Sequence, residues 1–173
     1  MTSTSFPSAT LPTGRREERD GQPHLVLTRT FRAPAEDVWR CVTEADRLAR
    51  WIGTWRGDPS TGRVEFSMTF DHMPFEPYVI EVCEPPRRLR VHTENEKPQD
   101  DWTLDVRLSE QDGTTTLELA QLVDSTTDAA DVGPGWEYQL DRLEAAVRGE
   151  DATAVTFGER YTSLAEGYGR AFA

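Results

Sequence analysis

The sequence is poor in positive charge and has no long apolar run. Its 173 residues include 19 Lys and Arg against 31 Asp and Glu, which gives a net charge of −12. Nucleic acids bind through clustered Lys and Arg, and anionic membrane surfaces attract the same residues, so we expect neither partner. No apolar stretch approaches the roughly 20 residues that cross a bilayer, and the first residues lack a basic region followed by an apolar one. We therefore expect a soluble, cytoplasmic protein.

The recognised signatures of catalytic and metal sites are absent too. Two cysteines are too few for the disulfide framework of a small secreted domain. We expect Cys41 to be a buried small residue in a helix and Cys83 to be inert near a strand end. The three histidines, His24, His72 and His92, are scattered without a second ligand at metal spacing. With no nucleophile elbow or glycine-rich phosphate loop, the sequence predicts no metal, no cofactor and no defined catalytic residue.

The length suits one domain with a tail at each end. Residues 1–23 are rich in Ser, Thr and Pro and then in charge, without periodicity, and we expect them to be disordered and outside the fold. Residues 24–149 form the predicted domain. Residues 150–173 form a predicted helical extension, in which Phe157, Tyr161, Leu164 and Tyr168 recur at helical spacing. We favour docking of this extension on its own domain over packing against another subunit, which leaves a monomer or a homodimer.

Most of the predicted domain consists of short segments in which apolar and polar residues alternate. Alternation is typical of half-buried antiparallel strands, and short connections between successive strands predict a meander. In the third segment, Tyr78, Ile80 and Val82 are expected to face inward, opposite to Cys83. Together the segments predict a six-stranded antiparallel sheet, with strands at residues 24–31, 62–70, 78–83, 89–93, 102–108 and 114–123.

One long helix is predicted near the C-terminal end of the domain, from Gly133 to Arg148. Its apolar residues Trp136, Leu140, Leu143 and Val147 fall on one stripe, Pro134 suits a first turn, and Gly149 can end the helix in a left-handed conformation. Two short helices are predicted after the first strand, one starting at Pro34 and one at about residues 45–51. These large apolar side chains need an apolar surface to pack against, and the inward face of the predicted sheet supplies it.

Three passages resemble a known group of proteins. Residues 29–52 (RTFRAPAEDVWRCVTEADRLARWI), 77–92 (PYVIEVCEPPRRLRVH) and 135–147 (GWEYQLDRLEAAV) are similar in order and spacing to START-like (SRPBCC) proteins, in the branch that resembles the activator of Hsp90 ATPase homologue 1 (AHSA1). The resemblance implies an α+β helix-grip (START/Bet v 1-like) fold, with an antiparallel sheet wrapped around the long C-terminal helix. It also implies a pocket for an apolar ligand between them.

The inward register predicts the wall of such a pocket, although the same residues would also form the core of a domain that encloses nothing. Buried polar groups among them need partners. Arg29, for example, lies on the apolar face of the first strand and needs either a buried carboxylate or the polar part of a ligand. The candidate ligand-binding residues are Arg29, Trp51, Phe66, Met68, Phe70, Tyr78, Ile80, Val91, Thr93, Trp102, Leu104, Leu117, Leu119, Trp136, Leu140 and Leu143.

Three functions fit these observations. The first is an intracellular protein that binds a small hydrophobic or aromatic molecule between the sheet and the C-terminal helix. The second is an AHSA1-like module that contacts a chaperone or another protein. Such a partner would bind the tail helix or the outer face of the sheet. The third is an enzyme resembling polyketide cyclases and dehydratases, with Tyr78 or Arg29 as its general acid or base. A connected cavity larger than about 300 Å³ would favour the first and third over the second.

Overall fold

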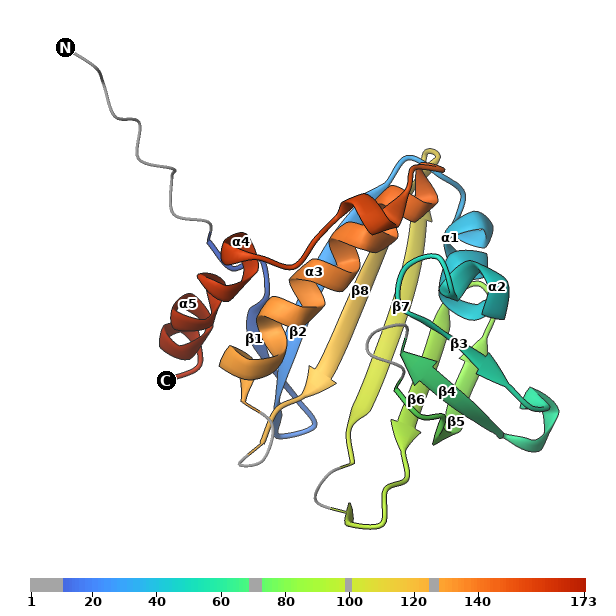
Figure 1. The fold of residues 1–173 in the computed structure, drawn as a ribbon, viewed down its shortest axis with the longest axis horizontal. Helices are drawn as coiled ribbons and strands as arrows, with labels where there is room; N and C mark the ends of the chain where they lie inside the picture. Colours follow the sequence, from blue (N-terminus) through green and yellow to red (C-terminus); the bar gives the residue numbers. More distant parts are fainter. Residues whose placement is uncertain (1–10, 69–72, 99–100, 125–127) are drawn as a thin grey trace.

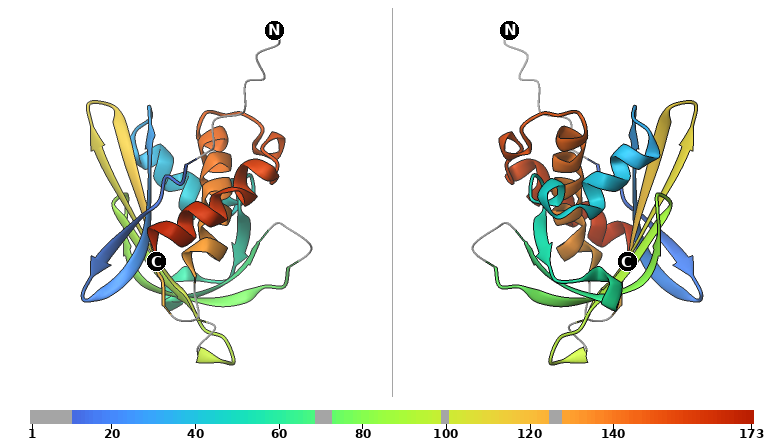
Figure 2. Two further views of the ribbon diagram at one scale, coloured as in Figure 1. Left: turned by 90° about the vertical axis from the view of Figure 1, so that its left-hand side faces the viewer. Right: turned by 90° about the vertical axis from the view of Figure 1, so that its right-hand side faces the viewer.

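An eight-stranded antiparallel sheet curls around one long helix (Figure 1). The computed structural model describes residues 11–68, 73–98, 101–124 and 128–173. Neighbouring strands follow the order β1-β2-β8-β7-β6-β5-β4-β3, and Figure 2 shows the two halves of the sheet rising on either side of the helix. The strands are β1 Arg15–Arg19, β2 Gln22–Phe31, β3 Gly53–Arg56, β4 Arg63–Met68, β5 Glu76–Glu84, β6 Arg88–Thr93, β7 Thr103–Gln111 and β8 Thr114–Leu122.

The long helix α3 spans Ala129–Val147 and starts four residues earlier than its sequence predicts. The side chain of Asp128 caps it by accepting a hydrogen bond from the Ala130 N–H at 2.9 Å, so Pro134 lies inside the helix rather than in its first turn. Gly149 ends the helix with a φ of 74°, as predicted. Within the described residues, no helix is both long and apolar enough to span a bilayer.

The sheet has two strands more than predicted, and the first of these is β1. Its sequence, RREER, has no apolar alternation, and it pairs with β2 through a two-residue turn in which Asp20 and Gly21 both have positive φ. Arg15 and Arg19 hold it in place by reaching across β2 to Glu118 of β8. Thr13 and Gly14, just before β1, donate hydrogen bonds to Glu137 and Tyr168. The prediction that residues 1–23 lie outside the fold is therefore wrong from Thr13 onward; residues 1–10 are outside the described part of the chain.

The second additional strand is β3, where the sequence predicts only a break after the second helix. A Cβ at Gly53 would lie 2.3 Å from the Ser67 carbonyl oxygen of β4, so the two backbones approach as only glycine allows. Both predicted helices that precede β3 are present, as α1 Ala35–Thr43 and α2 Ala45–Leu48, but α2 ends three residues before the predicted range of 45–51. They cover one end of the sheet, beside β3 (Figure 1), and so close one end of the space between α3 and the strands.

The C-terminal tail folds back on α3, as the sequence favours. It contains a 3-10 turn at Ala152–Ala154, then α4 at Glu159–Thr162 and α5 at Leu164–Ala171, and both helices pack on α3. Tyr168 is fully buried, and a Cβ at Gly133 would lie only 2.6 Å from its ring. The tail thus covers the side of α3 that faces away from the strands β3 to β6 (Figure 1).

Candidate functional site

A cavity of about 440 Å³ lies between α3, the pair α1 and α2, and the concave face of the sheet. Pockets that hold small molecules typically measure about 300–1,000 Å³, so its size is sufficient for a ligand. Its wall is almost wholly apolar. The structure places in this wall the predicted residues Trp51, Phe66, Met68, Tyr78, Ile80, Val91, Trp102, Leu104, Leu117, Leu119, Trp136, Leu140 and Leu143.

Two predicted residues, Thr93 and Arg29, are not part of this cavity wall, and a third cannot be placed relative to it. Phe70 lies outside the described residues. Thr93 is buried at the end of β6, where its hydroxyl oxygen accepts a hydrogen bond from the Trp102 backbone N–H at 2.9 Å, so it stabilises the β6–β7 connection. Arg29 points to the other side of α3, and its Nη2 lies 2.8 Å from the Glu137 carboxylate. Of the two partners that the sequence allowed for Arg29, the structure shows the buried carboxylate.

The wall also contains residues that strand alternation alone does not identify. The two helices and β3 contribute several of them, and the apolar side of the first helix was the available signal. On β5, an irregularity between Ile80 and Val82 shifts the register, so Cys83 faces the cavity in place of Val82. These further wall residues are Trp39, Val42, Thr43, Glu44, Leu48, Ile52, Trp55, Pro59 and Cys83. Val64, Leu89 and Val106 also line the cavity, and alternation does place these three on the inward register of the predicted strands.

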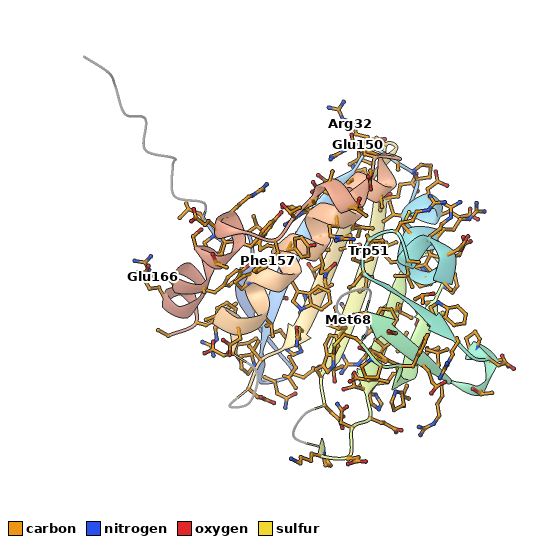
Figure 3. The ribbon with its side chains drawn as sticks, in the orientation of Figure 1. Arg32, Trp51, Met68, Glu150, Phe157 and Glu166 are labelled. Carbon is orange, nitrogen blue, oxygen red and sulfur yellow. The ribbon has the colours of Figure 1, made fainter. Side chains whose placement is uncertain are left out.

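All five tryptophans of the chain line this cavity. Three of them have their indole N–H bound to protein: Trp51 donates to the Cys41 carbonyl at 2.8 Å, Trp55 to the Thr43 carbonyl at 2.7 Å, and Trp136 to the Gln121 side chain at 2.5 Å. The hydrogen bonds fix the ring orientations. Figure 3 shows Trp51 and Met68 on the side of α3 that faces β3 and β4.

A series of aromatic rings crosses the wall from β4 to α3. Phe66 and Tyr78 meet edge to face at 5.4 Å, Tyr78 and Trp102 meet edge to face at 5.9 Å, and Trp102 lies 6.1 Å from Trp136. Tyr78 is 8% exposed, and its hydroxyl has no hydrogen-bond partner among the described residues. Burial raises the pKa of Tyr78 well above its ordinary value, and the nearby Glu76 carboxylate raises it further. The group therefore stays a neutral hydroxyl at physiological pH.

The exposed residues of the wall mark where the cavity opens. Only Glu44, Pro59 and Cys83 of the lining residues are exposed to solvent. They come from the α1–α2 junction, from the 3-10 turn at Pro59–Thr61, and from β5. Among the described residues, no group of three His, Cys, Asp or Glu side chains is placed to hold a metal ion.

The position of Cys83 at this opening gives a test of the cavity's geometry. We expect a thiol reagent such as 5,5′-dithiobis(2-nitrobenzoate) to modify about one thiol per native chain quickly, because Cys83 is exposed while Cys41 is buried and burial raises its pKa. A Cys83→Ser variant should lose the fast phase, and a Cys41→Ser variant should keep it. Fast modification of Cys41 in the native protein would contradict the arrangement described.

Comparison with known proteins places the chain in a family. The family model described as Activator of Hsp90 ATPase homolog 1-like protein matches residues 32–148. The crystal structure of CalU16 from Micromonospora echinospora is 27% identical, with a TM-score of 0.68 over 95% of this chain and 96% of that chain. A Bordetella parapertussis protein solved by NMR is 25% identical, with a TM-score of 0.65 over 99% of this chain and 94% of that chain. No curated protein shows a significant match to this chain.

These findings agree with the curled sheet, the C-terminal helix and the sequence passages that resemble START-like proteins. The match covers the two short helices, strands β3 to β8 and all of α3. The architecture fits the helix-grip fold, with eight strands in place of six. The chain therefore belongs to the family of Activator of Hsp90 ATPase homolog 1-like proteins.

Proposed function

We propose that this protein binds a small hydrophobic or aromatic molecule in the cavity between the sheet and α3. The observation that carries the proposal is the concentration of all five tryptophans in the wall of one apolar cavity. Aromatic rings provide large contact areas for flat apolar ligands, and a buried apolar surface is the main source of affinity for such molecules. Three of the rings are held by hydrogen bonds to protein atoms, so the site is preorganised.

The groups in the wall favour binding over catalysis. Tyr78 is the one buried ionisable group that lines the cavity within the described residues, since Glu44 and Cys83 are exposed at the opening and Cys41 is not part of the wall. A general base works best with a pKa near the working pH, and the raised pKa of Tyr78 makes its phenolate rare. Among the described wall residues, this hydroxyl is therefore the buried group through which a cyclase or dehydratase could act.

The outer face of the sheet gives less support to a protein-interaction role. Its charged side chains are paired with one another: Asp105 is 4% exposed and meets Arg88 at 2.8 Å and Arg107 at 3.2 Å, and Glu81 meets His92 at 2.7 Å. Protein interfaces usually centre on buried aromatic or apolar anchors. The paired charges do not provide such anchors, which leaves the cavity as the better-supported site.

A variant that fills the cavity tests the proposal. Val106 lines the cavity on β7, whereas Ser109 lies exposed on the opposite face of the same strand. We expect Val106→Trp to weaken binding of the neutral fluorophore 1-aminoanthracene about tenfold or more, because the added indole takes the ligand's space. Ser109→Trp is the matched control and should leave affinity unchanged, with binding measured by fluorophore emission. Equal affinity in all three proteins would contradict binding at this site, as would no binding by the wild type.

A further inference from the structure

Among the described residues, the cavity has a carboxylate in its wall but no cation. Its lining contains no Arg, Lys or His within the described residues, and its one carboxylate, Glu44, is exposed at the opening. A second carboxylate, Glu76, lies two residues before Tyr78 on β5 and acts electrostatically on its hydroxyl. The whole chain carries a net charge of −12. At the opening, Glu44 is paired with Arg47 at 3.0 Å. An anionic ligand would therefore meet the negative charge of Glu76 near Tyr78, with no cation among the described wall residues to compensate for its lost hydration.

Tyr78 is the polar group best placed to orient a ligand. It is more than nine-tenths buried and belongs to the cavity wall, and its ring is held edge to face between Phe66 and Trp102. No described residue accepts a hydrogen bond from its hydroxyl. Its hydroxyl oxygen is not one of the fully enclosed unpaired atoms of the described residues, so it is open to a hydrogen-bond partner supplied from within the cavity.

We propose that the cavity selects neutral aromatic ligands that carry a hydrogen-bond acceptor, such as a ketone oxygen, and that Tyr78 donates to this acceptor while carboxylates are rejected. This inference rests on the proposed function and specifies its ligand class. In this arrangement the ligand's aromatic rings pack among the tryptophans, and its acceptor oxygen accepts a hydrogen bond from the Tyr78 hydroxyl. Fatty acids and aromatic acids of similar size are excluded by their charge.

Three naphthalenes of nearly the same shape test the inference. 2-Acetylnaphthalene carries a ketone, 2-ethylnaphthalene replaces its oxygen with hydrogen, and 2-naphthoate carries a carboxylate. Titration followed by quenching of tryptophan emission should give about a fivefold higher affinity for the ketone than for the ethyl compound. It should also give an affinity for naphthoate about a hundredfold below that for the ketone, since a carboxylate would enter without a counter-charge.

Tyr78→Phe is the diagnostic variant, because it keeps both ring contacts and removes only the hydroxyl. The ketone should then bind no better than the ethyl compound, whose affinity should be unchanged or slightly higher. Tyr161→Phe is the matched control: its hydroxyl donates to Asp141 at 2.8 Å on the tail side of α3, so it should leave all three affinities as they are.

The possible outcomes separate this inference from the proposed function. Binding of the ethyl compound with no advantage for the ketone, or an advantage that persists in Tyr78→Phe, would overturn the role of Tyr78 and leave the binding function standing. Naphthoate binding as tightly as the ketone would overturn the selection against anions. Failure of all three compounds to bind the wild type would overturn the proposed function itself, and the inference with it.

Discussion

Replacing Arg29 with methionine is expected to lower the free energy of unfolding by about 3–5 kcal/mol, the range measured when one partner of a buried ion pair is removed. Arg29 is 9% exposed and binds the Glu137 carboxylate at 2.8 Å. Its guanidinium also lies 3.6 Å from Asp141 and 3.3 Å from Glu144, both on α3. The variant would leave these three carboxylates of one helix without their shared cation.

The effect of this substitution should depend on pH. Burial by itself raises the pKa of Glu137, but hydrogen bonds from Tyr168, Thr13 and Arg29 outweigh burial and hold the pKa below its ordinary value. A carboxyl with a lowered pKa in the folded state stabilises the fold above its unfolded pKa, and this stabilisation is lost as pH falls through the folded pKa. The stability difference between the wild type and Arg29→Met should therefore shrink as pH falls from 7 toward about 3.

Urea unfolding at several pH values would measure both effects. Arg63→Met is the matched control, because Arg63 also pairs with a carboxylate, Glu94, but both side chains are exposed. We expect this control to lose no more than about 1 kcal/mol. An Arg29→Met variant as stable as the control at neutral pH would show that the buried pair does not stabilise the fold as its geometry indicates.

Local periodicity was sufficient to predict most of this fold. The strands β4 to β8 alternate along most of their length, and the stripe of Trp136, Leu140 and Leu143 repeats with the helical period, so each pattern is contained in one stretch of sequence. The cavity wall follows from the same patterns, because the inward register of the strands and the apolar stripe of α3 must face each other. Most of the predicted ligand-binding residues therefore line one cavity.

The remaining features depend on contacts between distant parts of the chain. The strand RREER is held by ion pairs with Glu118, about a hundred residues away, and no local pattern indicates it. The irregularity after Ile80 exchanges Val82 for Cys83 in the wall, which strict alternation cannot predict. For Arg29, the sequence indicates a need for a partner, but only the tertiary structure shows that Glu137 meets that need.

Replacing Tyr168 with alanine is expected to lower the free energy of unfolding by about 3–5 kcal/mol, as found for other buried aromatic residues. Tyr168 is fully buried between α5 and α3, where its ring packs on Gly133 and its hydroxyl donates to Glu137 at 2.5 Å. The backbone N–H of Gly14 donates to the same hydroxyl at 3.1 Å. One side chain therefore joins the C-terminal tail, α3 and the segment that leads into β1.

Two measurements separate this structural role from any role in binding. Tyr168→Phe keeps the ring and removes the hydroxyl, so it should lose only about 1–3 kcal/mol, the cost of leaving the buried Glu137 without one of its donors. Because Tyr168 is not among the residues of the cavity wall, folded Tyr168→Ala should bind 1-aminoanthracene with the affinity of the wild type. A large loss of affinity in the folded variant would mean that the tail shapes the cavity through α3. A variant as stable as the wild type would mean that the tail, although docked in the structure, contributes little to the stability of the domain.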